Sequence, residues 1–130
     1  MQMPPLSSIS RESERVIQLQ LDAYNSRDLD AWLSTYSEDA EQSMLHMGSL
    51  AKGHAAIRKR MEERFQDPNL HAKLLHRVVM ETTVVDHELV TRTLPDRLAE
   101  VEMICIHEVK SGKIVNATFA VGQMRDKSAS

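Results

Sequence analysis

The clearest alternation of hydrophobic and polar positions lies in residues 99–122, where two β-branched runs flank a short segment containing Gly112. Such a pattern is typical of a β-hairpin. His107 is the one ionisable residue in the alternating apolar set, so we expect it to lie on the buried face of the hairpin. That face consists of Val101, Met103, Cys105, His107, Val115, Ala117, Phe119 and Val121.

Two registers of this hairpin are compatible with the sequence. A two-residue loop, 111–112, would place Cys105 opposite Thr118, whereas a three-residue loop, 110–112, pairs Cys105 with Ala117. The three-residue loop has glycine where such loops need a left-handed residue. A slip of one residue would mix the apolar and polar sets, so burial favours the three-residue loop.

Apolar residues at helical spacing predict three helices in the first half of the chain. The first is capped by Ser8 or Ser10 and is interrupted at residues 25–27. Asp28 caps a short second helix, and Gly53 opens a third helix. Their apolar positions are Val16, Ile17, Leu19, Leu21, Ala23 and Tyr24, then Leu29, Trp32, Leu33 and Tyr36, then Ile57, Met61 and Phe65.

In three further segments, apolar and polar residues alternate with the two-residue period of a strand. Residues 40–47 place Gln42, Met44 and His46 on one face with Ala40. Residues 71–80 place Ala72, Leu74, His76, Val78 and Met80 on one face. In residues 84–93 the more apolar set is Val85, His87, Leu89 and Thr91, which predicts that His87 points inward and that Asp86 and Glu88 point outward.

The order α-α-β-α-β-β-β-β predicts an α+β fold, with three N-terminal helices packed on one face of a mostly antiparallel sheet. Hairpin arms of about 11 residues, roughly 37 Å long, must curve strongly to close over helices. We therefore expect a cone-shaped domain with a pocket between helices and sheet. Residues 1–130 form this single domain, with loose tails at 1–8 and 124–130.

Composition narrows the function classes. The net charge is −3 with interspersed signs, so no basic surface for nucleic acid is expected. No apolar run suggests a signal peptide or a membrane span, and the expected location is cytoplasmic. The single cysteine, Cys105, excludes an intrachain disulfide and is expected to be a small buried hydrophobe.

Three segments resemble the nuclear transport factor 2-like superfamily, which includes ketosteroid isomerases and polyketide cyclases. Residues 23–40 resemble its opening, residues 52–58 the start of its third helix, and residues 109–115 its final hairpin. The resemblance covers about residues 10–122 and implies the conical α+β fold. It says little about function, because this superfamily holds enzymes, binding proteins and assembly domains.

The steroid isomerases of this superfamily use a tyrosine in the first helix and two aspartates on strands. The resemblance places Gln20, Met44 and Cys105 at these positions. Methionine cannot take a proton, and cysteine is a poor replacement for an acid kept neutral by an apolar site. The resemblance therefore implies the fold of the isomerases without their mechanism.

Histidines are the remaining candidates for proton transfer, because imidazole titrates near neutrality. We expect His46 and His107 to be catalytic groups in one cavity. The alternative is that they are hydrogen-bonded histidines of the core or rim. No metal is expected, since neither His-x-His nor His-x-x-x-His occurs. The other expected pocket-lining residues are Gln20, Tyr24, Trp32, Tyr36, Met44, His76, His87, Met103, Cys105 and Phe119.

The sequence leaves three functions open. The first is a cofactor-free isomerase, lyase or cyclase acting on a small hydrophobic molecule. The second is a binding protein for an apolar ligand, and the third is an assembly domain. No membrane or nucleic-acid partner is expected. A homodimer is expected through the outer sheet face, where an apolar centre has a charged rim; its residues are Glu102, Ile104, Ile106 and Thr118.

Overall fold

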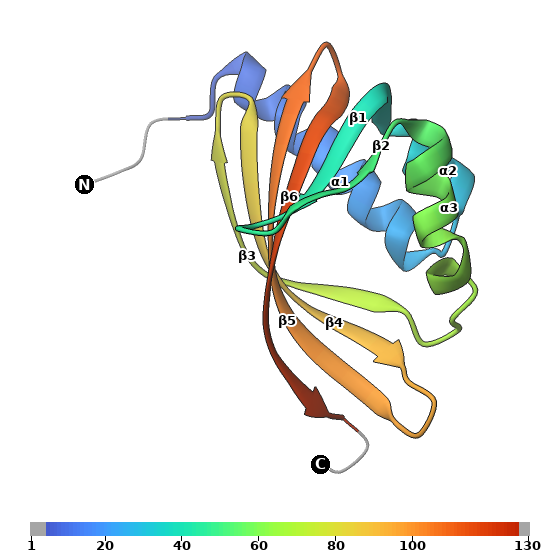
Figure 1. The fold of residues 1–130 in the computed structure, drawn as a ribbon. Helices are drawn as coiled ribbons and strands as arrows, with labels where there is room; N and C mark the ends of the chain where they lie inside the picture. Colours follow the sequence, from blue (N-terminus) through green and yellow to red (C-terminus); the bar gives the residue numbers. More distant parts are fainter. Residues whose placement is uncertain (1–4, 128–130) are drawn as a thin grey trace.

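The computed structural model describes residues 5–127 and confirms the predicted α+β class (Figure 1). Helices lie on one face of a six-stranded sheet with the order β2-β1-β6-β5-β4-β3. All neighbouring strands are antiparallel except β1 and β6. The elements are α1 (Ser8–Asn25), α2 (Leu29–Ser34), β1 (Tyr36–Met44), β2 (Gly48–Lys52), α3 (His54–Phe65), β3 (His71–Met80), β4 (Thr83–Thr93), β5 (Leu98–Lys110) and β6 (Lys113–Asp126).

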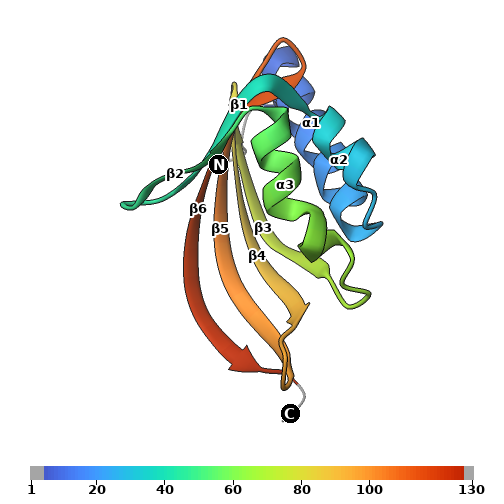
Figure 2. The same ribbon diagram turned by 45° about the vertical axis from the view of Figure 1, so that its right-hand side comes forward.

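The sheet is strongly bent, as expected for strands of this length. Figure 2 shows that β4, β5 and β6 continue past the helices, and that α3 stands in front of the concave face. Trp32 and Tyr36 are packed between the helices and this face, with ring centroids 4.7 Å apart. The helices therefore cover one end of the concave face and leave the other end uncovered.

The predicted helices are confirmed, with small changes at their ends. Ser7 rather than Ser8 or Ser10 caps α1, and its hydroxyl accepts a hydrogen bond from the amide of Ser10 at 3.0 Å. Asp28 caps α2 as predicted, and α3 follows Gly53. A left-handed φ of 85° at this position explains why it is glycine.

The first strand begins and ends earlier than predicted, and the earlier end leaves His46 in a turn. Tyr36, expected in the second helix, is the first residue of β1, which ends at Met44. The chain then turns back into β2, a strand that the sequence prediction missed. His46 lies in this turn with a φ of 68° and is exposed, so its expected place on the inner face is wrong.

The β5–β6 hairpin combines a two-residue turn with a bulge. Ser111 and Gly112 form the turn, both with positive φ, and Val115 has no partner on β5. Cys105 consequently pairs with Phe119, so both predicted registers are wrong. The turn and the bulge each shift the pairing by one residue, and the predicted faces survive except at Val115.

Another bulge lies in β3. Beyond it, the residues predicted to point inward point outward, and their neighbours point inward. The pairing register between β3 and β4 shifts between Leu74 and His76, so His76 is exposed and Arg77 points inward. On β4 the prediction is inverted. His87 lies on the outer face, whereas Asp86 and Glu88 are buried, because Arg77 supplies a counter-charge on the inner face.

The ends of the chain differ partly from the sequence prediction. β6 continues to Asp126, so residues 124–126 of the expected loose tail are strand. Residues 1–4 and 128–130 lie outside the described part of the chain. No helix among residues 5–127 combines the length and hydrophobicity needed to cross a bilayer.

Candidate functional site

A cavity of about 240 Å³ lies between the helices and the concave face of the sheet. This volume is slightly below the range of about 300–1,000 Å³ that is common for pockets of drug-sized ligands. Its size suits a small organic molecule. The apolar part of its wall consists of Leu21, Met61, Ala72, Val90, Val101, Met103, Phe119 and Val121.

Most of the site residues expected from the sequence lie around this cavity. His107 is among them, and so are Gln20, Tyr24, Trp32, Tyr36, Met44, Met103, Cys105 and Phe119. The positions that the resemblance equates with the isomerase machinery, Gln20, Met44 and Cys105, therefore share one cavity.

Three expected histidines lie elsewhere, so the pairing of His46 with His107 is wrong. His46 is in the β1–β2 turn, and His76 is exposed beyond the β3 bulge. His87 donates from Nε2 to Glu102 Oε2 over 2.6 Å on the outer face. His107 is the only histidine of the described chain that lines the cavity.

Glu88 is the carboxyl group that sequence reasoning missed. It is the only carboxyl among the residues lining the cavity, and the thiol of Cys105 donates to its Oε1 over 3.6 Å. Burial and the nearby negative charge of Asp86 raise the pKa of Glu88 to about 7. At neutral pH its protonated and ionised forms therefore have similar populations.

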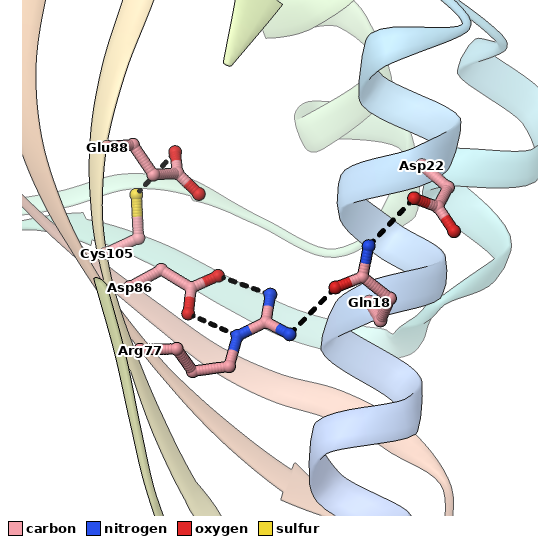
Figure 3. A network of polar contacts seen from close by, with 6 residues as sticks. All are labelled: Gln18, Asp22, Arg77, Asp86, Glu88 and Cys105. Carbon is pink, nitrogen blue, oxygen red and sulfur yellow. Dashed lines mark hydrogen bonds and ion pairs between the residues drawn. The ribbon is translucent and has the colours of Figure 1, made fainter. Parts of the chain in front are cut away.

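A buried ion pair lies beside Glu88 on the same face of β4. Arg77 donates from Nε and Nη2 to both carboxylate oxygens of Asp86, at 2.6 and 2.9 Å. Its Nη1 donates to Gln18 on α1, which in turn donates to Asp22, as Figure 3 shows. This network gives Asp86 a counter-charge two residues from Glu88.

His107 provides a different kind of polar group. It is 1% exposed, and neither ring nitrogen has a hydrogen-bond partner within the described chain. Burial lowers its pKa to about 4, so the imidazole is neutral at neutral pH. A neutral imidazole has one N–H donor and one acceptor. His107 thus retains one donor and one acceptor without a hydrogen-bond partner among the described residues.

Another wall of the cavity carries a hydrogen-bonded chain from α3 to β1. Arg60 donates from Nη1 to Gln42 Oε1 at 2.8 Å, and Gln42 donates from Nε2 to Tyr36 Oη at 3.4 Å. Burial raises the pKa of the Tyr36 phenol, which keeps it protonated. This chain orients polar groups without supplying a second base.

No cluster of three His, Cys, Asp or Glu side chains that could hold a metal ion occurs among residues 5–127. The described site offers Glu88, Cys105 and His107 as its polar centre. Burial and the neighbouring Glu88 raise the pKa of the Cys105 thiol, so it is not an activated thiolate. The remaining proton carrier is Glu88.

Glu88 could have been located from the sequence by considering Asp86-His87-Glu88 together with Arg77, a basic residue on the neighbouring strand. Counting apolar residues placed both acids outside, because carboxylates are usually solvated. A basic residue on the neighbouring strand can make the acidic face the inner one. Without knowing the β3 bulge, however, Arg77 itself is assigned to the outer face.

Comparisons with known proteins agree with this fold. The model of the SnoaL-like domain matches residues 17–117. The epoxide hydrolase/cyclase-like enzyme SalBIII, which acts in pyran ring formation in salinomycin, superposes with a TM-score of 0.81 at 14% identity, covering 89% of this chain and 96% of that one. A comparison with curated proteins gives no match.

Two further solved structures show the same fold. A protein from Jannaschia sp. CCS1, assigned as a SnoaL-like polyketide cyclase, has a TM-score of 0.79 at 14% identity, covering 92% of this chain and 91% of that one. TerC, co-crystallised with polyporic acid, has a TM-score of 0.74 at 15% identity, covering 85% and 92%. At these identities the likeness concerns the fold alone.

Proposed function

Since this chain belongs to the SnoaL-like domain family of the nuclear transport factor 2-like superfamily, we propose that it is a cofactor-free enzyme that transfers a proton on a small, largely apolar substrate. Glu88 is the general acid and base in this proposal. Isomerase, lyase and cyclase reactions all fall within this chemistry. Structural relatives of this fold include the cyclase-like SalBIII and TerC with polyporic acid, which supports a small organic occupant.

The single observation that carries the proposal is the state of Glu88. A base works best when its pKa lies near the working pH, and burial in an apolar cavity is a common way to raise a carboxyl to that range. Glu88 has a pKa of about 7 and lines the cavity. A buried carboxyl with only a structural role would be more stable as a carboxylate paired with a basic side chain, as Asp86 is with Arg77.

The proposed step is proton removal from a carbon next to a carbonyl group. The Glu88 carboxylate takes the proton, the C–H bond breaks, and its electron pair forms an enolate with the carbonyl. Glu88 is then a neutral acid that returns the proton to the substrate. His107 donates an N–H to the carbonyl oxygen, where negative charge develops.

The test uses deuterium exchange, because the substrate is not identified. A panel of small cyclic ketones, enones and β-dicarbonyl compounds is incubated with the protein in D2O, and exchange is followed by proton NMR. We expect the protein to accelerate exchange in at least one compound. Glu88→Gln should reduce that acceleration by about 100-fold or more, the range typical of a lost general base.

The matched control is Glu108→Gln on β5, which removes a carboxyl that pairs with Lys110 away from the cavity. This variant should exchange at the wild-type rate. Equal exchange by wild-type protein and Glu88→Gln would contradict the assignment of Glu88. Binding of panel compounds without any exchange would favour the second candidate, a non-catalytic binding protein.

The second candidate is favoured by the replaced isomerase positions. Gln20, Met44 and Cys105 line the cavity without supplying an acid or a base of the family type. An apolar ligand could be held there by packing and by hydrogen bonds to His107. Glu88→Gln would then change the affinity for the ligand modestly, and neither wild-type protein nor the variant would catalyse a reaction.

A further inference from the structure

Three arginines from two elements meet at one end of the cavity. Arg60 and Arg64 are four residues apart on α3, and therefore on one helix face, while Arg92 lies on β4. All three line the cavity and also an outer groove. They stand where the cavity meets this groove. The other residues that line this groove are Glu63, Gln66, Asp67, Pro68, Asn69, Thr93 and Leu94.

These three arginines are not neutralised within the described chain. Arg60 donates to Gln42, but no ion pair is formed by Arg60, Arg64 or Arg92 among residues 5–127. The Nε of Arg92 is buried and has no hydrogen-bond partner there. Five other arginines pair with carboxylates, namely Arg15, Arg58, Arg77, Arg97 and Arg125, whereas Arg11 and Arg27 form no ion pair among residues 5–127.

The mutual proximity of these three positive charges is electrostatically unfavourable. Burial lowers the pKa of Arg60 and of Arg64, and the positive charges of Arg92 and Arg60 lower the pKa of Arg64 further. Partly buried cations without an anion destabilise a folded protein. An arrangement that keeps three of them together is explained by an anion that binds there.

The acids nearest in the fold do not serve as that anion. Asp67 lines the outer groove, but its carboxylate accepts hydrogen bonds from the amides of Asn69 and Thr93. Glu63 also lines the groove and is exposed. The charges that act on Glu88 are those of Asp86 and Arg77. Glu88 lines the same cavity, but it forms no ion pair with these arginines among residues 5–127.

We propose that Arg60, Arg64 and Arg92 bind the carboxylate of an apolar organic acid whose body fills the cavity. The guanidinium fork matches a carboxylate in shape and can donate two parallel hydrogen bonds. Arg60 also lies 5.9 Å from the centre of the Phe119 ring, which forms part of the apolar wall. This inference rests on the proposed function in one respect, that the occupant is the substrate.

The test compares two probes of the same shape, trans-cinnamate and trans-cinnamamide, which differ in charge. Their affinities are measured by isothermal titration calorimetry at pH 7.5. We expect cinnamate to bind about 10- to 100-fold more tightly, the range for hydrogen bonds to a charged group. Arg64→Met and Arg92→Met keep the apolar stem and should remove most of this preference.

The matched control is Arg58→Met, on the same helix, which replaces an arginine that pairs with Asp30 at the surface. It should keep the wild-type preference. Equal affinities of the two probes for wild-type protein would overturn the inference, and so would a preference that persists in Arg64→Met and Arg92→Met. Inorganic sulfate gives a second measurement on wild-type protein: it should weaken cinnamate binding and leave cinnamamide binding unchanged.

Failure of this inference can be told apart from failure of the proposed function. If both probes bind equally, the arginine site is absent while an apolar pocket remains. If neither probe binds, the inference is overturned and the pocket itself is in question. Deuterium exchange in neutral ketones depends on Glu88 and needs no carboxylate, so it reports on the proposed function alone.

Discussion

Glu88 and His107 lie on neighbouring inner strands, and burial moves their pKa values in opposite directions. It raises that of the carboxyl to about 7 and lowers that of the imidazole to about 4. In both cases the neutral form is favoured, because a low-dielectric surrounding penalises charge. Near pH 5 to 6 the cavity therefore contains a neutral acid and a neutral imidazole.

The raised pKa of Glu88 predicts how stability depends on pH. Between about pH 4.5 and 7 the unfolded chain loses this proton while the folded protein keeps it, so the free energy of unfolding falls as pH rises. The contribution is about 3 kcal/mol at about 1.4 kcal/mol per pKa unit. In urea unfolding across this range, the stability of Glu88→Gln should fall less, or rise more, with pH than that of wild-type protein.

His107 acts in the same pH range with the opposite sign, so the variant is needed to isolate Glu88. The imidazole is protonated in the unfolded chain below about pH 6.5 and stays neutral when folded down to about pH 4. It therefore makes stability rise with pH. Identical pH profiles for wild-type protein and Glu88→Gln would show that Glu88 titrates normally.

At the scale of elements, the Arg77–Asp86 ion pair joins β3 to β4, and Gln18 extends it to α1. Asp86 is fully buried, so removing Arg77 leaves a charge with no partner. Arg77→Met should destabilise the protein by about 3–5 kcal/mol in urea unfolding. The double variant Arg77→Met, Asp86→Leu should recover much of that loss. A small effect of Arg77→Met alone would mean that Asp86 is not held as a carboxylate.

The helices could be predicted from the sequence because their signals are local. Asp28 as a cap, Gly53 before α3 and the spacing of Ile57, Met61 and Phe65 all act within a few residues. The same holds for β5, where the inward-facing positions alternate without interruption from Val101 to Val109. The face that carries His107 follows from this alternation.

The strands with bulges could not be predicted in full. An extra residue reverses every later side chain, and neither bulge, at Val115 or between Leu74 and His76, has a distinct sequence signal. At the hairpin a second shift in the turn cancels the first. In β3 nothing cancels it, so the alternation alone assigns Arg77 to the outer face. Glu88 is missed for a separate reason, because the other face of β4 is the more apolar one.

At the scale of the molecule, the outer sheet face remains the predicted dimer surface. Ile104 and Ile106 lie there beside Glu102, on the face opposite the cavity. Ile104→Glu should convert a dimer to a folded monomer, because it puts a charge into the apolar centre. Light scattering measures the mass, and Leu19→Glu on the exposed side of α1 is the control. A monomeric wild-type protein at micromolar concentration would contradict the prediction.

We also predict that the protein does not isomerise Δ5-3-ketosteroids at an enzymatic rate. Gln20, Met44 and Cys105 stand where the resemblance places the catalytic residues of that reaction. Loss of a general base and loss of an oxyanion donor each cost about 100-fold or more. A spectrophotometric assay measures conjugated product. Rapid turnover would show that other residues of this cavity perform the steroid reaction.

The central claim is that the cavity holds a carboxyl poised between its two protonation states. Carbon-13 NMR of protein labelled at the glutamate carboxyl carbons measures this directly across pH 3 to 9. We expect one resonance to titrate with a pKa of about 7 and to be missing from the spectrum of Glu88→Gln. If every glutamate resonance titrates near its usual pKa of about 4.3, Glu88 is not poised for proton transfer and the account is contradicted.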